Sequence, residues 1–210
     1  MIFIRNESFR EYMKYYPIAF YLLAINLMVH LLNLLLGDKL LVLGRLYFNI
    51  SYLGEAELWR YVTSIFLHAD MQHLLFNCFS LFLFAPSLER LLGHVKFLTL
   101  YVLAGIMGNI ASKIWYDNIL NEAVVTVGAS GAIYGVLGAY IYIFVYHRAT
   151  LDLLSRRTLQ IFLIIGIASP LIPLVFGGGR VNLAAHLGGF ITGFLLFMLY
   201  KKMKLRSKSK

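Results

Sequence analysis

The stretch Gly128-Ala129-Ser130-Gly131-Ala132-Ile133-Tyr134-Gly135 places one serine among small residues and begins an apolar run that continues to Tyr146. Small residues in such a run usually allow helices to pack closely, so the stretch alone is weak evidence of chemistry. The function inferred from it depends on where the rest of the chain places Ser130 and on which groups can reach its hydroxyl.

The composition favours a protein surrounded by lipid. The 210 residues are 60% hydrophobic and 14% charged, whereas soluble domains carry about 25% charged residues. A soluble protein of this composition would expose large apolar patches and aggregate. We therefore expect an all-α membrane protein, because open strands in lipid would leave backbone groups unpaired. The length predicts a single membrane domain, 1–210, and the lone Cys78 excludes an internal disulfide.

The apolar pattern predicts six transmembrane helices, each near the ~20 residues that cross a bilayer. These segments are roughly 17–36, 72–92, 95–116, 128–146, 158–176 and 183–200. The fourth is the shortest and richest in glycine, which is typical of a central helix surrounded by protein. The long connection 37–71 contains aromatic residues beside Arg60, and this mixture predicts a loop partly embedded in the headgroup region.

Lysine and arginine residues indicate the orientation of the bundle. If the N-terminus is cytoplasmic, fourteen of the 19 basic residues lie on the inner side and only Lys39, Arg45, Arg60, Lys113 and Arg180 lie outside. We therefore predict that both termini are inside. The net charge of +9 first suggests nucleic acid, but its distribution argues otherwise, since the tail 201–210 alone holds six basic residues. That tail is expected to contact anionic lipid.

Polar residues gather where three predicted helices begin in the outer leaflet. His73 and Asn77 begin the second segment, Ser130 the fourth and His186 the sixth, and ionisable residues inside a membrane are usually functional. Imidazole has a pKa suited to activating a serine, so His186 is the candidate base for Ser130. His73, the Asn77 amide and the Ser130 backbone N–H are candidate donors to an oxyanion. Segments four to six hold no Asp or Glu, which predicts a Ser–His dyad.

Residue spacing adds geometry to this prediction. Ser130 and Tyr134 are four residues apart, which places the aromatic ring one helical turn below the hydroxyl. His186, Gly189 and Gly193 form a stripe on one face, and small residues let helix backbones approach closely in lipid. The fourth and sixth segments should therefore pack tightly enough for the imidazole to reach the serine.

A metal site is not expected. His68 lies five residues before His73, a spacing that does not share a helical face. The sequence also has no HExxH motif and no cysteine pair.

Together these motifs resemble the rhomboid family of intramembrane serine proteases. The resemblance covers roughly residues 55–200. Its motifs are Gly128-Ala129-Ser130-Gly131, His73 with Asn77, Ala185-His186-Leu187-Gly188-Gly189 continuing to Gly193, Trp59-Arg60 and Glu89-Arg90.

The resemblance implies a six-helix core with a water-accessible cavity open to the outside. It also implies Ser130 as nucleophile, His186 as general base, His73 and Asn77 as oxyanion-stabilising residues, and Tyr134 as the ring that packs against the histidine. The expected partners are transmembrane protein substrates, cleaved near their outer ends without metal or nucleotide. The expected location is the cell membrane, in a bacterium the plasma membrane.

Two other classes of function remain as alternatives. The first is a catalytically inactive relative that binds transmembrane clients, although such relatives typically lack the serine or the histidine. The second is a transporter or channel, which would predict broken helices, midplane charges and repeat symmetry. The sequence shows none of these three features.

Overall fold

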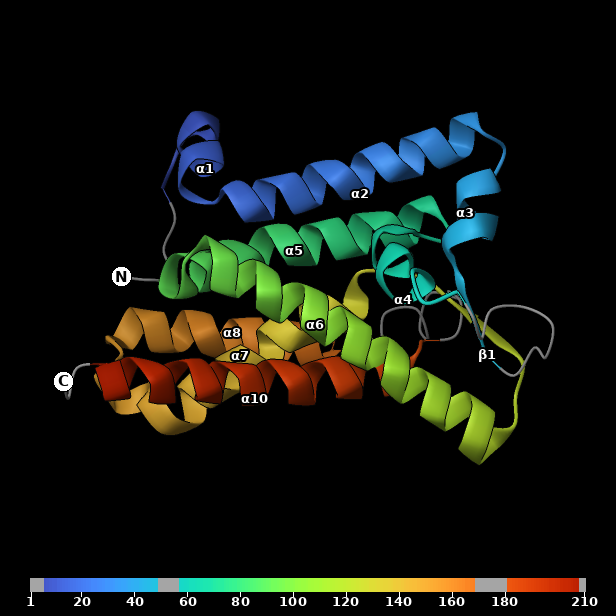
Figure 1. Ribbon diagram of the computed structural model, residues 1–210. Helices are drawn as coiled ribbons and strands as arrows, with labels where there is room; N and C mark the ends of the chain where they lie inside the picture. Colours follow the sequence, from blue (N-terminus) through green and yellow to red (C-terminus); the bar gives the residue numbers. More distant parts are fainter. Residues whose placement is uncertain (1–5, 49–56, 169–180, 208–210) are drawn as a thin grey trace.

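The structure, a computed structural model, describes residues 6–48, 57–168 and 181–207, and most of these residues are helical. The main helices run alongside one another as a bundle (Figure 1). Their bounds are α1 Phe9–Tyr15, α2 Pro17–Leu35, α5 Met71–Leu92, α6 His94–Lys113, α7 Ser130–His147, α8 Leu153–Ala168 and α10 Leu183–Ser207.

Five helices within the described ranges are long and apolar enough to cross a membrane. They are α2, α5, α6 with its continuation to Leu120, α7 and the Leu183–Tyr200 part of α10. Large apolar side chains on their outer faces, such as Leu31, Leu75 and Leu195, are exposed, as expected where lipid is the solvent. The chain is therefore a multi-pass integral membrane protein.

The predicted helix positions agree with these bounds at most of their ends. The predicted segment 158–176 corresponds to α8, which begins earlier, and the part of that prediction after Ala168 lies outside the described residues. α6 continues as a π-helical turn, Ile114–Leu120, and α10 runs past the predicted end to Ser207.

α7 occupies the middle of the bundle. It packs against α5, α6, α8 and α10, and its Val136, Leu137, Ala139 and Tyr140 are almost completely buried. A helix enclosed by protein needs less apolar length than one exposed to lipid, which fits the shortness and glycine content of this segment.

The described parts of the connection between α2 and α5 contain short elements at one end of the bundle. These elements are α3 Lys39–Gly44, strand β1 Leu46–Phe48, α4 Arg60–Thr63 and a 3-10 turn, Ser64–Phe66. Arg60 is buried and donates hydrogen bonds to the carbonyls of Val42 and Arg45 at 3.1 and 3.0 Å. β1 pairs antiparallel with β2, Val124–Thr126, with Leu46 opposite Thr126. The apolar pattern does not predict this pairing, which ties the connection to the chain that enters α7.

Helix α1 is a second feature outside the sequence prediction. It begins with a capping box in which the Glu11 carboxylate accepts a hydrogen bond from the Ser8 backbone N–H at 2.8 Å. In Figure 1, α1 lies at the same end of the bundle as the C-terminal part of α10. The short elements α3, β1 and α4 lie toward the opposite end.

Candidate active site

Ser130 is the first residue of α7, directly after a tight passage from β2. Gly128 in this passage has φ +123°, and its N–H donates a hydrogen bond to the Ser64 carbonyl at 2.8 Å. A Cβ at Gly128 would lie 2.7 Å from the His73 ring. Glycine is therefore required both by the backbone conformation and by the approach of that imidazole.

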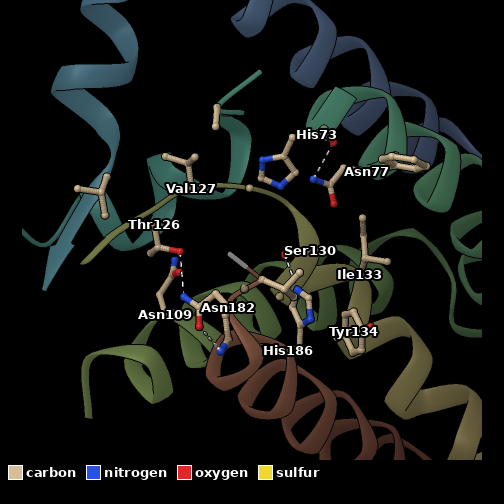
Figure 2. Close-up of a pocket in the computed structure, with 18 of the residues that line it drawn as sticks. His73, Asn77, Asn109, Thr126, Val127, Ser130, Ile133, Tyr134, Asn182 and His186 are labelled. Carbon is tan, nitrogen blue, oxygen red and sulfur yellow. Dashed lines mark hydrogen bonds between the residues drawn. The ribbon is translucent and has the colours of Figure 1, made fainter. Parts of the chain in front are cut away.

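His186 lies in the first turn of α10, and its side chain reaches Ser130 at the start of the neighbouring helix α7. Its Nε2 is 2.9 Å from Ser130 Oγ, and Figure 2 shows the two side chains facing each other. The imidazole stacks on the Tyr134 ring, with centroids 4.0 Å apart and an interplanar angle of 7°. The Tyr134 hydroxyl in turn donates a hydrogen bond to the Gly166 carbonyl of α8 at 2.9 Å. Stacking on an anchored ring therefore fixes the plane of the histidine.

Glycines bring the two helices that carry this pair into backbone contact. A Cβ at Gly189 would collide with the carbonyl of Gly131, and one at Gly193 would collide with the carbonyl of Gly135. The close packing that the glycine stripe predicts is thus present in the structure. It brings the start of α10 within hydrogen-bonding distance of the start of α7.

His73 and Asn77 lie at the beginning of α5, on the other side of Gly128. Asp70 caps this helix by accepting a hydrogen bond from the His73 N–H at 2.8 Å. The Asn77 amide donates to the His73 carbonyl at 3.2 Å, and both side chains line the same cavity as Ser130 and His186. The four residues that the sequence singled out therefore meet in one place, carried by three helices (Figure 2).

The cavity around these residues has a volume of about 500 Å³. It is lined by α5, α6, β2, α7 and α10. Within the described part of the chain, His186 Nδ1 has no hydrogen-bond partner. The arrangement offers a hydroxyl beside an imidazole, which is the pairing required for proton transfer from a serine nucleophile.

His68 lies beside the site without joining it. The side chain is buried, and its ring centroid is 5.2 Å from that of His73. Burial is the main cause that lowers the pKa of His68 from 6.5 to about 3, and charge on His73 and His30 lowers it further. No group of three potential metal ligands occurs among the residues that the structure describes.

Asn109 of α6 and Asn182, the residue before α10, also line the cavity, although the sequence pattern did not single them out. Asn109 donates hydrogen bonds to the Tyr61 carbonyl at 2.9 Å and to Ser64 Oγ at 3.0 Å. Ser112 donates to Asn182 Oδ1 at 3.0 Å. Two polar residues three positions apart in an apolar segment are the signal that could have found this network.

The bundle and its cavity define a polytopic membrane protein in which a serine and a histidine from separate helices meet. The family model of the Rhomboid domain matches residues 55–203, and the chain belongs to the rhomboid family.

Several curated relatives support this assignment. The chain is 37% identical over 209 residues to the putative rhomboid protease YdcA of Bacillus subtilis (strain 168), covering 98% of this chain and 99% of the relative. It is 33% identical over 177 residues to the rhomboid protease AarA of Providencia stuartii, covering 78% and 62% of the two chains. It is 32% identical over 155 residues to the rhomboid protease GlpG of Haemophilus influenzae, covering 73% and 75%.

Proposed function

We propose that the chain is an intramembrane serine endopeptidase that hydrolyses peptide bonds in or near the transmembrane segments of other membrane proteins. The observation that carries the proposal is the 2.9 Å contact between Ser130 Oγ and His186 Nε2 at the cavity. Membership of a family whose curated relatives are named rhomboid proteases supports it.

In this mechanism Ser130 Oγ attacks the carbonyl carbon of the scissile peptide bond while His186 Nε2 takes the hydroxyl proton. The tetrahedral intermediate collapses when His186 returns that proton to the leaving amine, which leaves an acyl-enzyme on Ser130. Water then attacks the ester and gives a proton to His186, and His186 passes this proton to Ser130 Oγ as the acid product leaves, which restores the free serine and the neutral imidazole. The pair acts as a dyad, with Tyr134 holding the imidazole plane by stacking.

The oxyanion of the intermediate requires hydrogen-bond donors on the side of Ser130 that faces α5. The Asn77 amide, the His73 ring and the Ser130 backbone N–H are assigned this role, helped by the positive end of the α7 dipole. The absence of a side chain at Gly128 allows this role for His73, because it lets the His73 ring approach the passage before Ser130.

The proposal includes a membrane topology. The whole chain, 1–210, forms one rhomboid-like domain with six transmembrane helices, α8 being part of the fifth, and both ends face the cytoplasm. The connection between α2 and α5 then lies at the outer surface, partly embedded in headgroups, near the cavity. The position of α1 at the same end of the bundle as the C-terminal part of α10 supports this arrangement (Figure 1). The proposed location is the plasma membrane of a bacterium.

Labelling with a serine-reactive fluorophosphonate tests the nucleophile directly. We expect wild-type protein in detergent to be labelled, and Ser130→Ala and His186→Ala to lose the label. Ser87→Ala removes another buried serine and should label normally. A wild-type protein that is folded but never labelled would overturn the protease and favour a binder of transmembrane clients.

Cleavage of single-span substrates tests the reaction itself. Co-expression of the protein with a panel of such substrates should yield two fragments with wild type and none with Ser130→Ala. Asn77→Ala should lower the cleavage rate by ~100–1,000-fold, the typical loss on removing one oxyanion donor. A rate equal to that of wild type would remove Asn77 from the mechanism.

A further inference from the structure

Asn182 occupies the position directly before α10, one helical turn ahead of His186. Its side-chain Oδ1 accepts a hydrogen bond from the Ala185 N–H at 3.0 Å, and its backbone carbonyl accepts one from the His186 N–H at 3.2 Å. Asn182 is therefore the N-cap of the helix that carries His186.

The same side chain also reaches two other segments. Its Nδ2 donates a hydrogen bond to Thr126 Oγ1 of β2 at 3.0 Å, which Figure 2 shows beside the cavity. Its Oδ1 accepts a second hydrogen bond from Ser112 of α6 at 3.0 Å. Both partners are buried. One amide thus joins the start of α10 to the strand β2 and to a second helix, α6.

The bridge to Thr126 is parallel, in the sequence, to the proposed catalytic contact. Thr126 precedes Ser130 by four residues, and Asn182 precedes His186 by four residues. The 3.0 Å bridge and the 2.9 Å contact between Ser130 and His186 therefore link the same two segments at two successive levels. Because the Asn182–Thr126 bond holds together the residues just before α7 and α10, it restricts how α10 can rotate or slide against the chain that enters α7.

We propose that Asn182 is a positioning residue that sets the height and rotation of the first turn of α10, so that His186 Nε2 faces Ser130 Oγ. This inference rests on the proposed protease function. Catalytic groups need to be held to within about 0.5 Å of their productive geometry, and the Asn182–Thr126 bridge supplies that constraint on the helix that carries the base.

Capping alone does not account for the observed contacts. An N-cap needs only an acceptor oxygen, which serine supplies about as well as asparagine. The Nδ2 donor of Asn182 is not used for capping, yet it bonds to Thr126. The two roles can therefore be separated by mutation.

The experiment uses the full-length protein in detergent, with a cleavable single-span substrate and a melting temperature for every variant. Asn182→Ser keeps a cap but is too short to reach Thr126, and Thr126→Val removes the hydroxyl at nearly constant volume. Each should lower kcat by about 10–100-fold, the range expected for a small misplacement of a catalytic group. KM should change little, because the substrate-contacting groups remain.

Two further variants test the bridge as a unit. The double variant should lose no more kcat than Asn182→Ser alone, because both substitutions remove the same link between Asn182 and Thr126. Asn182→Asp should retain most activity, since its carboxylate accepts hydrogen bonds from both the Ala185 N–H and the Thr126 hydroxyl. Thr192→Val is the matched control: it removes a hydroxyl of α10 that donates to the Gly188 carbonyl of its own helix, and it should behave as wild type.

The outcomes separate this inference from the proposed function. A folded wild-type protein without Ser130-dependent cleavage would overturn the proposed function and this inference with it. If wild type cleaves the substrate, three results would overturn only the positioning role. They are an unchanged kcat in Thr126→Val, additive losses of kcat in the double variant, and a loss of kcat that parallels the fall in melting temperature.

Discussion

The interface between α7 and α10 and the interface between α2 and α5 hold helix pairs together in different ways. In the first, Gly189 and Gly193 bring the backbone of α10 against the carbonyls of α7. In the second, a side chain of one helix reaches the backbone of the other. The completely buried Glu89 of α5 accepts hydrogen bonds from the backbone N–H groups of Ile18 and Ala19, in the first turn of α2, at 3.0 and 2.8 Å.

This difference shows where the geometry of the site is fixed. Backbone surfaces in direct contact leave no flexible atoms to absorb a displacement, so the relative position of α7 and α10 is sharply determined. Side-chain contacts between α2 and α5 allow small shifts, because rotamers can adjust. The proposed dyad lies on the first interface, and α2 contributes none of the residues that line its cavity.

The largest effect is expected from adding one methyl group at the α7–α10 interface. In Gly193→Ala the new Cβ collides with the Gly135 carbonyl, and the helices must separate. Overpacking typically costs about 1–3 kcal/mol, and we expect at least the upper value here because the obstacle is backbone. Fluorophosphonate labelling should fall by ~100-fold, since His186 moves away from Ser130.

Gly37→Ala is the matched control in the connection after α2. A Cβ there meets no atom within 4 Å, but φ is +60°, so the cost is the backbone strain of about 1–2 kcal/mol. Labelling should be unchanged. Equal activity in the Gly193 and Gly37 variants would show that the contact between α7 and α10 does not control the site.

The sequence predicted the α7–α10 interface well because its signal is local. Gly189 and Gly193 fall on one helical face with His186, and periodicity alone identifies that face. The pairing of β1 with β2 and the bridge from Asn182 to Thr126 have no such signal, since each joins residues 56 to 80 positions apart. Such contacts depend on the path of the connecting chain, which composition does not determine.

Other local signals were present in the sequence but carried less weight than hydropathy. Ser8 followed by Glu11 is a capping box that marks the start of α1. The β-branched pair Val124-Val125 is typical of a strand, and it forms part of β2. Hydropathy identifies membrane segments because lipid imposes length and polarity, but it gives no information on short elements at the surface.

A smaller effect is expected from weakening the α2–α5 interface. Glu89→Gln replaces one carboxylate oxygen by an amide that cannot accept a hydrogen bond from an α2 N–H. Leaving a buried group unpaired costs about 1–3 kcal/mol, which should appear as a lower melting temperature. The decisive measurement is labelling below the melting transition, where we expect wild-type rates because α7 and α10 stay in contact.

Glu122→Gln provides the control for this charge change, because Glu122 is exposed. Its melting temperature should remain within the error of the wild-type value. If Glu89→Gln instead abolished labelling of a folded protein, the two interfaces would be coupled. The difference between a fixed α7–α10 interface and an adjustable α2–α5 interface would then not hold.

The smallest effect concerns His68, whose buried ring lies beside that of His73. Burial first, and charge on His73 and His30 second, lower the pKa of His68 from 6.5 to about 3. The unfolded side chain takes up a proton near its ordinary pKa, whereas the folded one stays neutral until the pH approaches the lowered value. Its contribution to stability is therefore complete above the unfolded pKa and is lost progressively as the pH falls toward the folded one.

Comparison of wild type with His68→Phe isolates this contribution. Between about pH 7.5 and about pH 5 the wild type should lose roughly 2 kcal/mol of stability through His68, seen as a fall in melting temperature. Phenylalanine fills a similar volume without titrating, so the variant should lose less over the same range. Parallel curves for the two proteins would mean that His68 is hydrated in the folded protein, and that this part of the structure opens to water more readily than the contact between α7 and α10.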